Sequence, residues 1–184
     1  MNSFRFITAC IALVLSVISL RAQELVQGSF RSLVETRVVS VKWDLSKVDI
    51  EGQTINDFIE FKSYEEGQDY HDNFEKDIRE ILGDFIDEFN DTNGPISLTV
   101  SSSPTVILTI QVNRISRKGN EVTCRYVFSD KATGEILTMV AMTSKDGRIG
   151  SFTNLMGDAF EKAGKDLGKF TKKMLKAELK KRNK

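Results

Sequence analysis

The sequence has few of the residues that build metal sites or covalent crosslinks: one histidine, one tryptophan, two prolines and two cysteines in 184 residues. A single histidine, His71, with carboxylates beside it falls short of the ligand set of a zinc site, so we expect it on the surface. Cys10 lies in an N-terminal apolar run that we expect to be removed, which leaves Cys124 without a partner for an intramolecular disulfide. Burial of apolar side chains must therefore stabilise the domain.

Patterns typical of catalysis or phosphate binding are also missing. Cys124 alternates with apolar residues in EVTCRYVF and has no histidine near it in sequence, so we expect a buried, inert thiol. The segment GKDLGK at 164–169 lies inside a predicted helix and does not follow a strand, as a phosphate loop would. We therefore expect a non-enzymatic protein with no cofactor and no bound metal.

No apolar run is long enough for a typical membrane-spanning helix. Phe6 to Leu20 is about 15 residues, whereas a span takes about 20. Arg5 precedes this run and the small residue Ala22 follows it, which is the layout of a secretory signal peptide. We predict a signal peptide at 1–22, cleavage after Ala22, and a single mature domain at 23–184 that is periplasmic or secreted. A permanent membrane anchor is the weaker alternative.

The formal net charge is zero, but the two signs are separated along the chain. Asp49 to Asp91 holds fifteen acidic and three basic residues, a net charge of −12. Glu161 to Lys184 holds ten basic and three acidic residues, a net charge of +7. The two segments can complement each other, or the basic end can face an anionic lipid or polymer. Nucleic acid is not an expected partner of an exported chain with this overall charge.

The closing segment predicts a long helix with two distinct strips. An apolar stripe recurs at steps of three and four residues: Met156, Phe160, Ala163, Leu167, Phe170 and Met174. Gly157, Gly164 and Gly168 fall together on the flank of this stripe. Glycine inside a helix costs roughly 1 kcal/mol relative to alanine, so three on one flank indicate close packing of another backbone or room for a ligand. Flexible glycines in a marginal helix are the alternative.

Hydrophobic periodicity predicts an ordered series of strands and helices before this helix. The predicted strands are Thr36–Asp44, Ile96–Val100, Thr105–Ser116, Glu121–Ser129 and Glu135–Ser144, and the predicted helices are a short one at Ile55–Phe61 and a long amphipathic one at Asp69–Asn90. The last three strands are joined by hairpins and form an antiparallel meander. We predict a two-layer α+β domain in which two main helices pack on one face of a mostly antiparallel sheet of about five strands.

Four segments carry a resemblance that covers nearly all of Gly28 to Lys173. They are Gly28–Gly52, FIDEFN at the end of the long helix, VILTIQVNRI at 106–115, and AFEKAGKDLGKF at 159–170. Together they resemble a family of small uncharacterised proteins exported into Gram-negative envelopes, whose closing helix reads Ala-aromatic-x-Lys-Ala-Gly-Lys-x-Leu-Gly-Lys. Phe160 stands at the position where that family has tyrosine. The resemblance implies the same fold and brings no catalytic residue. The element order is more distantly similar to accessory α/β domains of outer-membrane lipoproteins, which by itself implies no function.

Three functions remain open from the sequence. The first is an envelope module that binds a protein partner or assists assembly, for which we predict a basic tail as the contact surface: Lys172, Lys173, Lys176, Lys180, Lys181 and Arg182. The second is a binder of a small amphiphile between the sheet and the helices, beside the glycine strip. The third is a hydrolase, which would need a concave cluster of titratable groups with displaced pKa values.

Overall fold

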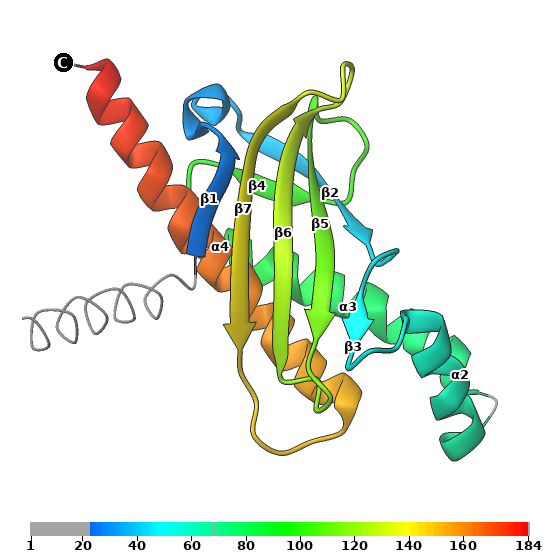
Figure 1. The fold of residues 1–184 in the computed structure, drawn as a ribbon. Coiled ribbons are helices and arrows are strands. Elements are labelled where there is room, and N and C mark those ends of the chain that lie inside the picture. The colour runs from blue at the N-terminus through cyan, green and yellow to red at the C-terminus, as the bar shows by residue number, and fades with distance from the viewer. Residues whose placement is uncertain (1–22, 68, 184) are drawn as a thin grey trace, which may run out of the picture.

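One sheet with helices packed behind it forms the body of the protein in the computed structural model, which describes residues 23–67 and 69–183 (Figure 1). The strands are β1 (Gln23–Gly28), β2 (Val38–Asp44), β3 (Asp49–Ile50), β4 (Ser97–Thr99), β5 (Val106–Ile115), β6 (Glu121–Asp130) and β7 (Ile136–Lys145). The helices are η1 (Phe30–Leu33), which is a 3-10 turn, α2 (Ile55–Glu66), α3 (Tyr70–Asn90) and α4 (Phe152–Arg182). Among these described helices, none combines the length and the apolar character needed to cross a membrane. The predicted signal peptide lies outside the described residues.

The predicted α+β class is confirmed, but the sheet is larger and more mixed than predicted. Its strand order is β1-β7-β6-β5-β2-β4, and β3 pairs with β5 outside this path. The pairs β1·β7, β6·β7 and β5·β6 are antiparallel, as the predicted meander requires. The pairs β2·β4, β2·β5 and β3·β5 are parallel. The expectation of about five, mostly antiparallel strands is therefore approximate, because the sheet has seven strands and joins three antiparallel pairs to three parallel ones.

The connection between β2 and β5 explains the parallel half. Parallel neighbours need a long crossover, and the chain supplies one by placing both α2 and α3 between these two strands. Two strands escaped prediction because their sequences carry little periodicity. All six residues of β1 are exposed at the sheet edge, and β3 has only two residues.

Local capping explains where α2 and α4 begin. Thr54 and Asp57 form a capping box at the start of α2, in which each side chain bonds the other residue's backbone N–H. Ser151 caps α4 by accepting a hydrogen bond from the Asn154 N–H at 3.3 Å. Helix α2 continues to Glu66, beyond the predicted end at Phe61. The two main predicted helices are thus accompanied by a third, shorter one.

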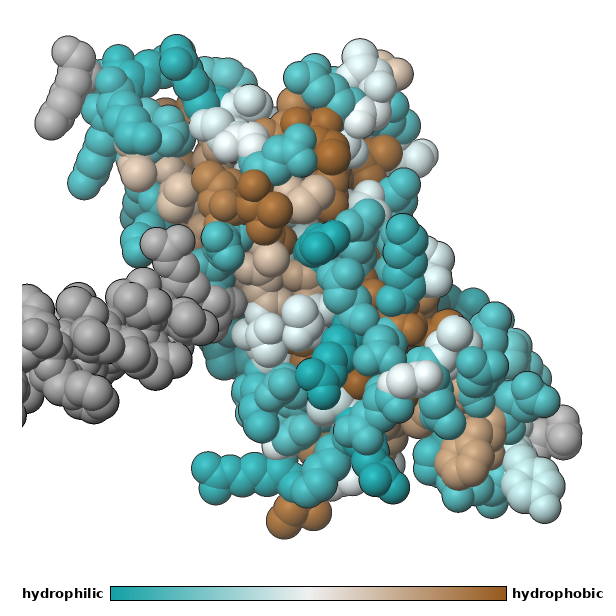
Figure 2. Space-filling model, in the orientation of Figure 1, coloured by the Kyte–Doolittle hydropathy of each residue, from teal (hydrophilic) through white to brown (hydrophobic). Residues whose placement is uncertain are grey.

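The core lies between the sheet and the helices α3 and α4. It is filled by the apolar faces of both helices and by every second residue of the central strands, including Phe85, Phe89, Phe160, Leu108, Ile110, Tyr126 and Phe128. Trp43 joins the two helices to β2, because its ring centroid lies 6.1 Å from that of Phe85 and 4.9 Å from that of Phe160. The opposite face of the sheet carries mixed residues, with a hydrophobic area toward one end of the strands (Figure 2).

Helices α3 and α4 approach each other closely at two glycines of α4. A Cβ atom at Gly164 would lie 2.3 Å from the Phe85 carbonyl oxygen, and one at Gly168 would lie 2.7 Å from the Thr92 side chain. At these two positions the neighbouring segment therefore fills the space beside the glycine strip. Gly157 differs, because the nearest atom to its Cβ position is Ile81 Cγ1 at 3.9 Å.

We expect Gly164→Ala to lower the free energy of unfolding by about 2–3 kcal/mol, since the α3 backbone has to move to admit the methyl group. The matched control is Gly157→Ala, which has ordinary van der Waals space and is expected to raise stability by up to about 1 kcal/mol through helix propensity. Urea unfolding of both variants measures the difference. Equal effects at the two positions would show that the close approach at Gly164 does not stabilise the fold.

Candidate partner-binding surface on helix α4

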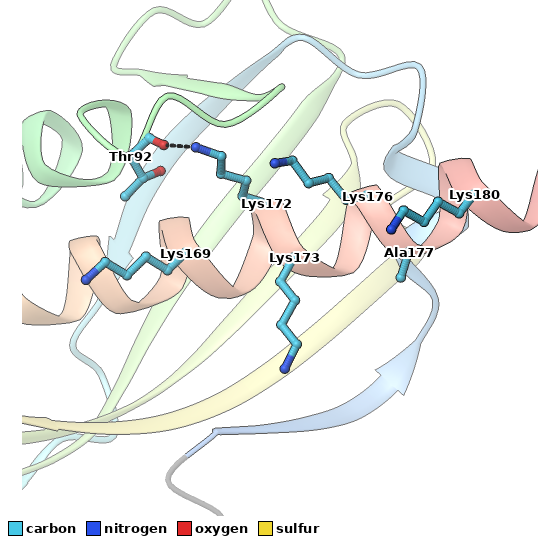
Figure 3. Close-up of a pocket in the computed structure, with 7 residues that line it drawn as sticks. All are labelled: Thr92, Lys169, Lys172, Lys173, Lys176, Ala177 and Lys180. Carbon is cyan, nitrogen blue, oxygen red and sulfur yellow. Dashed lines mark hydrogen bonds between the residues drawn. The ribbon is translucent and has the colours of Figure 1, made fainter.

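A groove lined almost entirely by lysine runs along the second half of α4. Its lining residues, which we call the lysine groove, are Thr92, Lys169, Lys172, Lys173, Lys176, Ala177 and Lys180 (Figure 3). The groove has a volume of about 580 Å³. Thr92 comes from the turn that follows α3, so the groove begins where the two helices meet.

Helical periodicity places these lysines opposite the buried stripe of α4. Residues at spacings of three and four share one helix face, and the core already occupies the Phe160 and Leu167 side. Lys169, Lys173, Lys176 and Lys180 are exposed. Lys172 is half-buried, and its ammonium donates a hydrogen bond to the Thr92 carbonyl oxygen at 2.7 Å, which ties α4 to the end of α3 (Figure 3).

The groove carries five positive charges that form no ion pair with the described residues. Across residues 23–67 and 69–183, none of its five lysines has a carboxylate within 4 Å, although lysines elsewhere on α4 do. Like charges gathered along one face build a positive potential that attracts anionic groups. The stems of the lysines and the Ala177 methyl also give the groove an apolar floor.

The structure divides the predicted basic tail between two surfaces. Lys172, Lys173, Lys176 and Lys180 come together in the lysine groove. Lys181 instead pairs with Glu178 at 2.7 Å and Arg182 pairs with Glu35, and both line a different hollow beside η1. The predicted tail did not include Lys169. This lysine precedes Lys172 by three residues and Lys173 by four, and that helical spacing could have indicated that it shares their face. Thr92 and Ala177 carried no such signal.

Acidic residues gather on the neighbouring part of the same helical layer. Asp84 and Asp87 of α3 and Asp158 and Glu161 of α4 are all exposed, and we call these four residues the acidic half. Partial burial raises the pKa of Glu161, and the carboxylates of Asp84, Asp158, Glu88 and Asp146 raise it further, in that order. Only one ion pair among the described residues joins α3 to α4, Lys165 to Glu88 at 3.2 Å.

Other candidate sites from the sequence carry no comparable arrangement. Cys124 is fully buried, and burial raises the pKa of its thiol to about 12, so it stays protonated and inert at neutral pH. His71 is exposed and lies 3.5 Å from Asp72, as predicted for a surface residue. The described residues include no group of three or more side chains able to hold a metal ion. The space beside Gly164 and Gly168 is filled by α3 and Thr92, which removes the room for a ligand there.

The raised pKa of Glu161 predicts a pH-dependent effect of its removal. In the unfolded chain this carboxyl ionises near its ordinary pKa of 4.5, whereas in the folded chain ionisation is opposed. Wild-type stability therefore falls as the pH rises from 4.5 through the raised pKa. We expect Glu161→Gln to be more stable than the wild type at about pH 7 and to have no advantage at about pH 4, where both states are largely protonated. Urea unfolding at the two pH values checks this, and an equal advantage at both would contradict it.

Comparisons with known proteins add little beyond this geometry. No known family model matches the chain, and no curated protein sequence matches it. Two solved structures of the PelC dodecamer from Paraburkholderia phytofirmans, one of them a variant, are similar in shape. The first has a TM-score of 0.40 and 8% identity and covers 78% of this chain and 96% of that one. The second has a TM-score of 0.38 and 9% identity and covers 79% and 96%. So weak a likeness assigns neither a family nor a function to this chain.

Proposed function

We propose that residues 23–184 form an exported, non-enzymatic module of the cell envelope that binds a protein partner through the lysine groove. The observation that carries this proposal is the set of five lysines that line one groove without a carboxylate neighbour among the described residues. Export rests on the signal-peptide pattern at 1–22 in the sequence.

The chemistry of the groove defines the kind of partner. Five ammonium groups select an anionic surface, and their separation along the helix suits a row of carboxylates rather than a single small anion. Protein interfaces of this kind associate faster at low ionic strength, because the charges steer the encounter. The partner is therefore an acidic protein surface, and its binding weakens as salt is added.

Site-specific photocrosslinking tests this proposal in the native compartment. Ala177 lines the groove, is exposed and carries no charge, so p-benzoylphenylalanine at this position samples the groove while every lysine remains. Irradiation of cells is expected to give a discrete protein adduct. The matched control is Ala132, which is exposed in the turn between β6 and β7 and is expected to give none.

Two outcomes would contradict the proposal. If the variant is exported and folded but gives no protein adduct at Ala177, no protein partner occupies the groove. Equal adducts at Ala177 and Ala132 would show contact without a specific surface. The same crosslinker at Ala177 is also tested together with Lys173→Glu, because loss of the adduct in that variant would show that the contact depends on the charge of the groove.

A second candidate, an anionic amphiphile, is supported by the same groove. Lysine stems and the Ala177 methyl provide apolar surface below the ammonium groups, which suits a molecule with an acyl chain and an anionic head. This candidate no longer rests on the glycine strip, whose space beside Gly164 and Gly168 is filled.

A native mass spectrum of the protein purified from its own periplasm separates the two candidates. For the proposed function we expect the mass of the bare 23–184 chain or of a protein complex, with Gln23 as the first residue. A small molecule released on denaturation and lost in the Lys173→Glu variant would favour the amphiphile instead. A mass that includes residues 1–22 would contradict cleavage after Ala22.

A further inference from the structure

We infer that the protein partner of the lysine groove is a second copy of this chain, bound so that the acidic half of each copy faces the lysine groove of the other. This inference rests on the proposed function, because it names the partner of the same surface. The two surfaces come from one helical layer, α3 and α4, on the side of the sheet away from the viewer (Figure 1).

The charges of this layer divide at a definite place. The first half of α4, with α3 beside it, carries the acidic half, and the second half of α4 carries the lysine groove. Between them lies the ion pair of Lys165 and Glu88, at 3.2 Å, which joins the two helices. On α4 itself, the sign of the exposed charge therefore changes between Glu161 and Lys165.

A face with one acidic and one basic half is complementary to itself. A two-fold axis perpendicular to the face near Lys165 and Glu88 would bring each acidic half onto the lysine groove of the other copy. Two-fold dimers use the same patch on both subunits, so the two contacts form together and the assembly closes. A purely basic face would repel its own copy, and it would need a different partner.

Within one copy, the two halves do not neutralise each other. The five lysines of the groove have no carboxylate within 4 Å in residues 23–67 and 69–183. The acidic half is under like-charge repulsion, since Asp84 and Asp158 add to the effect of burial in raising the pKa of Glu161. A second copy would supply carboxylates to the unpaired lysines and ammonium groups to the acidic half. It would therefore reduce the like-charge repulsion in both surfaces.

Charge reversal on each half, followed by mixing, tests the inference. One variant carries Lys173→Glu and Lys176→Glu in the lysine groove, and the other carries Asp84→Lys and Asp87→Lys in the acidic half. All four side chains are exposed, so the fold has no need of them. We expect the purified 23–184 chain to dimerise at low salt and each variant alone to dimerise at least about tenfold more weakly, since the reversed side chains then face like charges at both contacts. Sedimentation equilibrium measures these affinities.

Mixing the two variants gives the decisive result. In the mixed pair, one contact joins an unchanged acidic half to an unchanged lysine groove. The other contact joins the two reversed surfaces, where the introduced glutamates face the introduced lysines. We expect the mixture to form a one-to-one heterodimer, with an affinity restored to within about tenfold of the wild type. The control pair is Lys47→Glu with Lys118→Glu, which makes the same change in net charge at exposed residues of the loops after β2 and β5. This control is expected to dimerise like the wild type.

Three outcomes would overturn the inference. They are a wild type that stays monomeric up to about 100 μM at low salt, a dimer unaffected by either reversal, or a mixture that forms no heterodimer. A monomer would place the groove against a membrane if it binds vesicles that contain an anionic phospholipid and if Lys173→Glu with Lys176→Glu abolishes this binding.

The proposed function would fail separately, through the absence of any protein adduct at Ala177. An adduct with a different protein would keep the function and reject self-pairing.

Discussion

The close approach of the α3 and α4 backbones at Gly164 is the constraint on which the helical layer depends. A side chain there would meet the Phe85 carbonyl oxygen at 2.3 Å, so only glycine lets the two helices pack at this separation. Trp43 fits against Phe85 and Phe160 across the same contact. The ion pair of Lys165 with Glu88 and the hydrogen bond from Lys172 to Thr92 follow it along α4.

This packing also decides which charges reach solvent together. Because the apolar stripe of α4 faces the sheet and its glycine flank faces α3, the lysines are left on the outer side. The acids of α3 come to lie beside the first half of α4, where Asp84 and Glu88 add to the effect of burial in raising the pKa of Glu161. The surface with separated signs is thus a consequence of core packing, and the proposed binding function uses what that packing exposes.

Much of the fold could be predicted because its long elements carry strong periodicity. Helix α3, helix α4 and the three strands of the meander were all predicted, and the ends of α3 and of the three strands fall close to the predicted ones. Prediction failed for β1 and β3, where an exposed edge strand and a two-residue strand have no apolar alternation to detect. The parallel pairing of β2 with β5 could not be predicted, since pairing depends on contacts between distant segments. The candidate site was predicted in part: four of its lysines were in the basic tail, and Lys169 was not.

The sequence by itself determined the helices, the buried stripe, the unpaired Cys124 and the separation of charge along the chain, because each depends on local periodicity or composition. Only the tertiary structure decided that Gly164 and Gly168 touch α3 while Gly157 does not. It also decided that Lys181 and Arg182 turn to Glu178 and Glu35, and that the other lysines of the tail share a groove with Lys169 and Thr92. The physical reason is that these contacts join segments separated by many residues, and their geometry is set by how the helices pack and not by the residues in either segment alone.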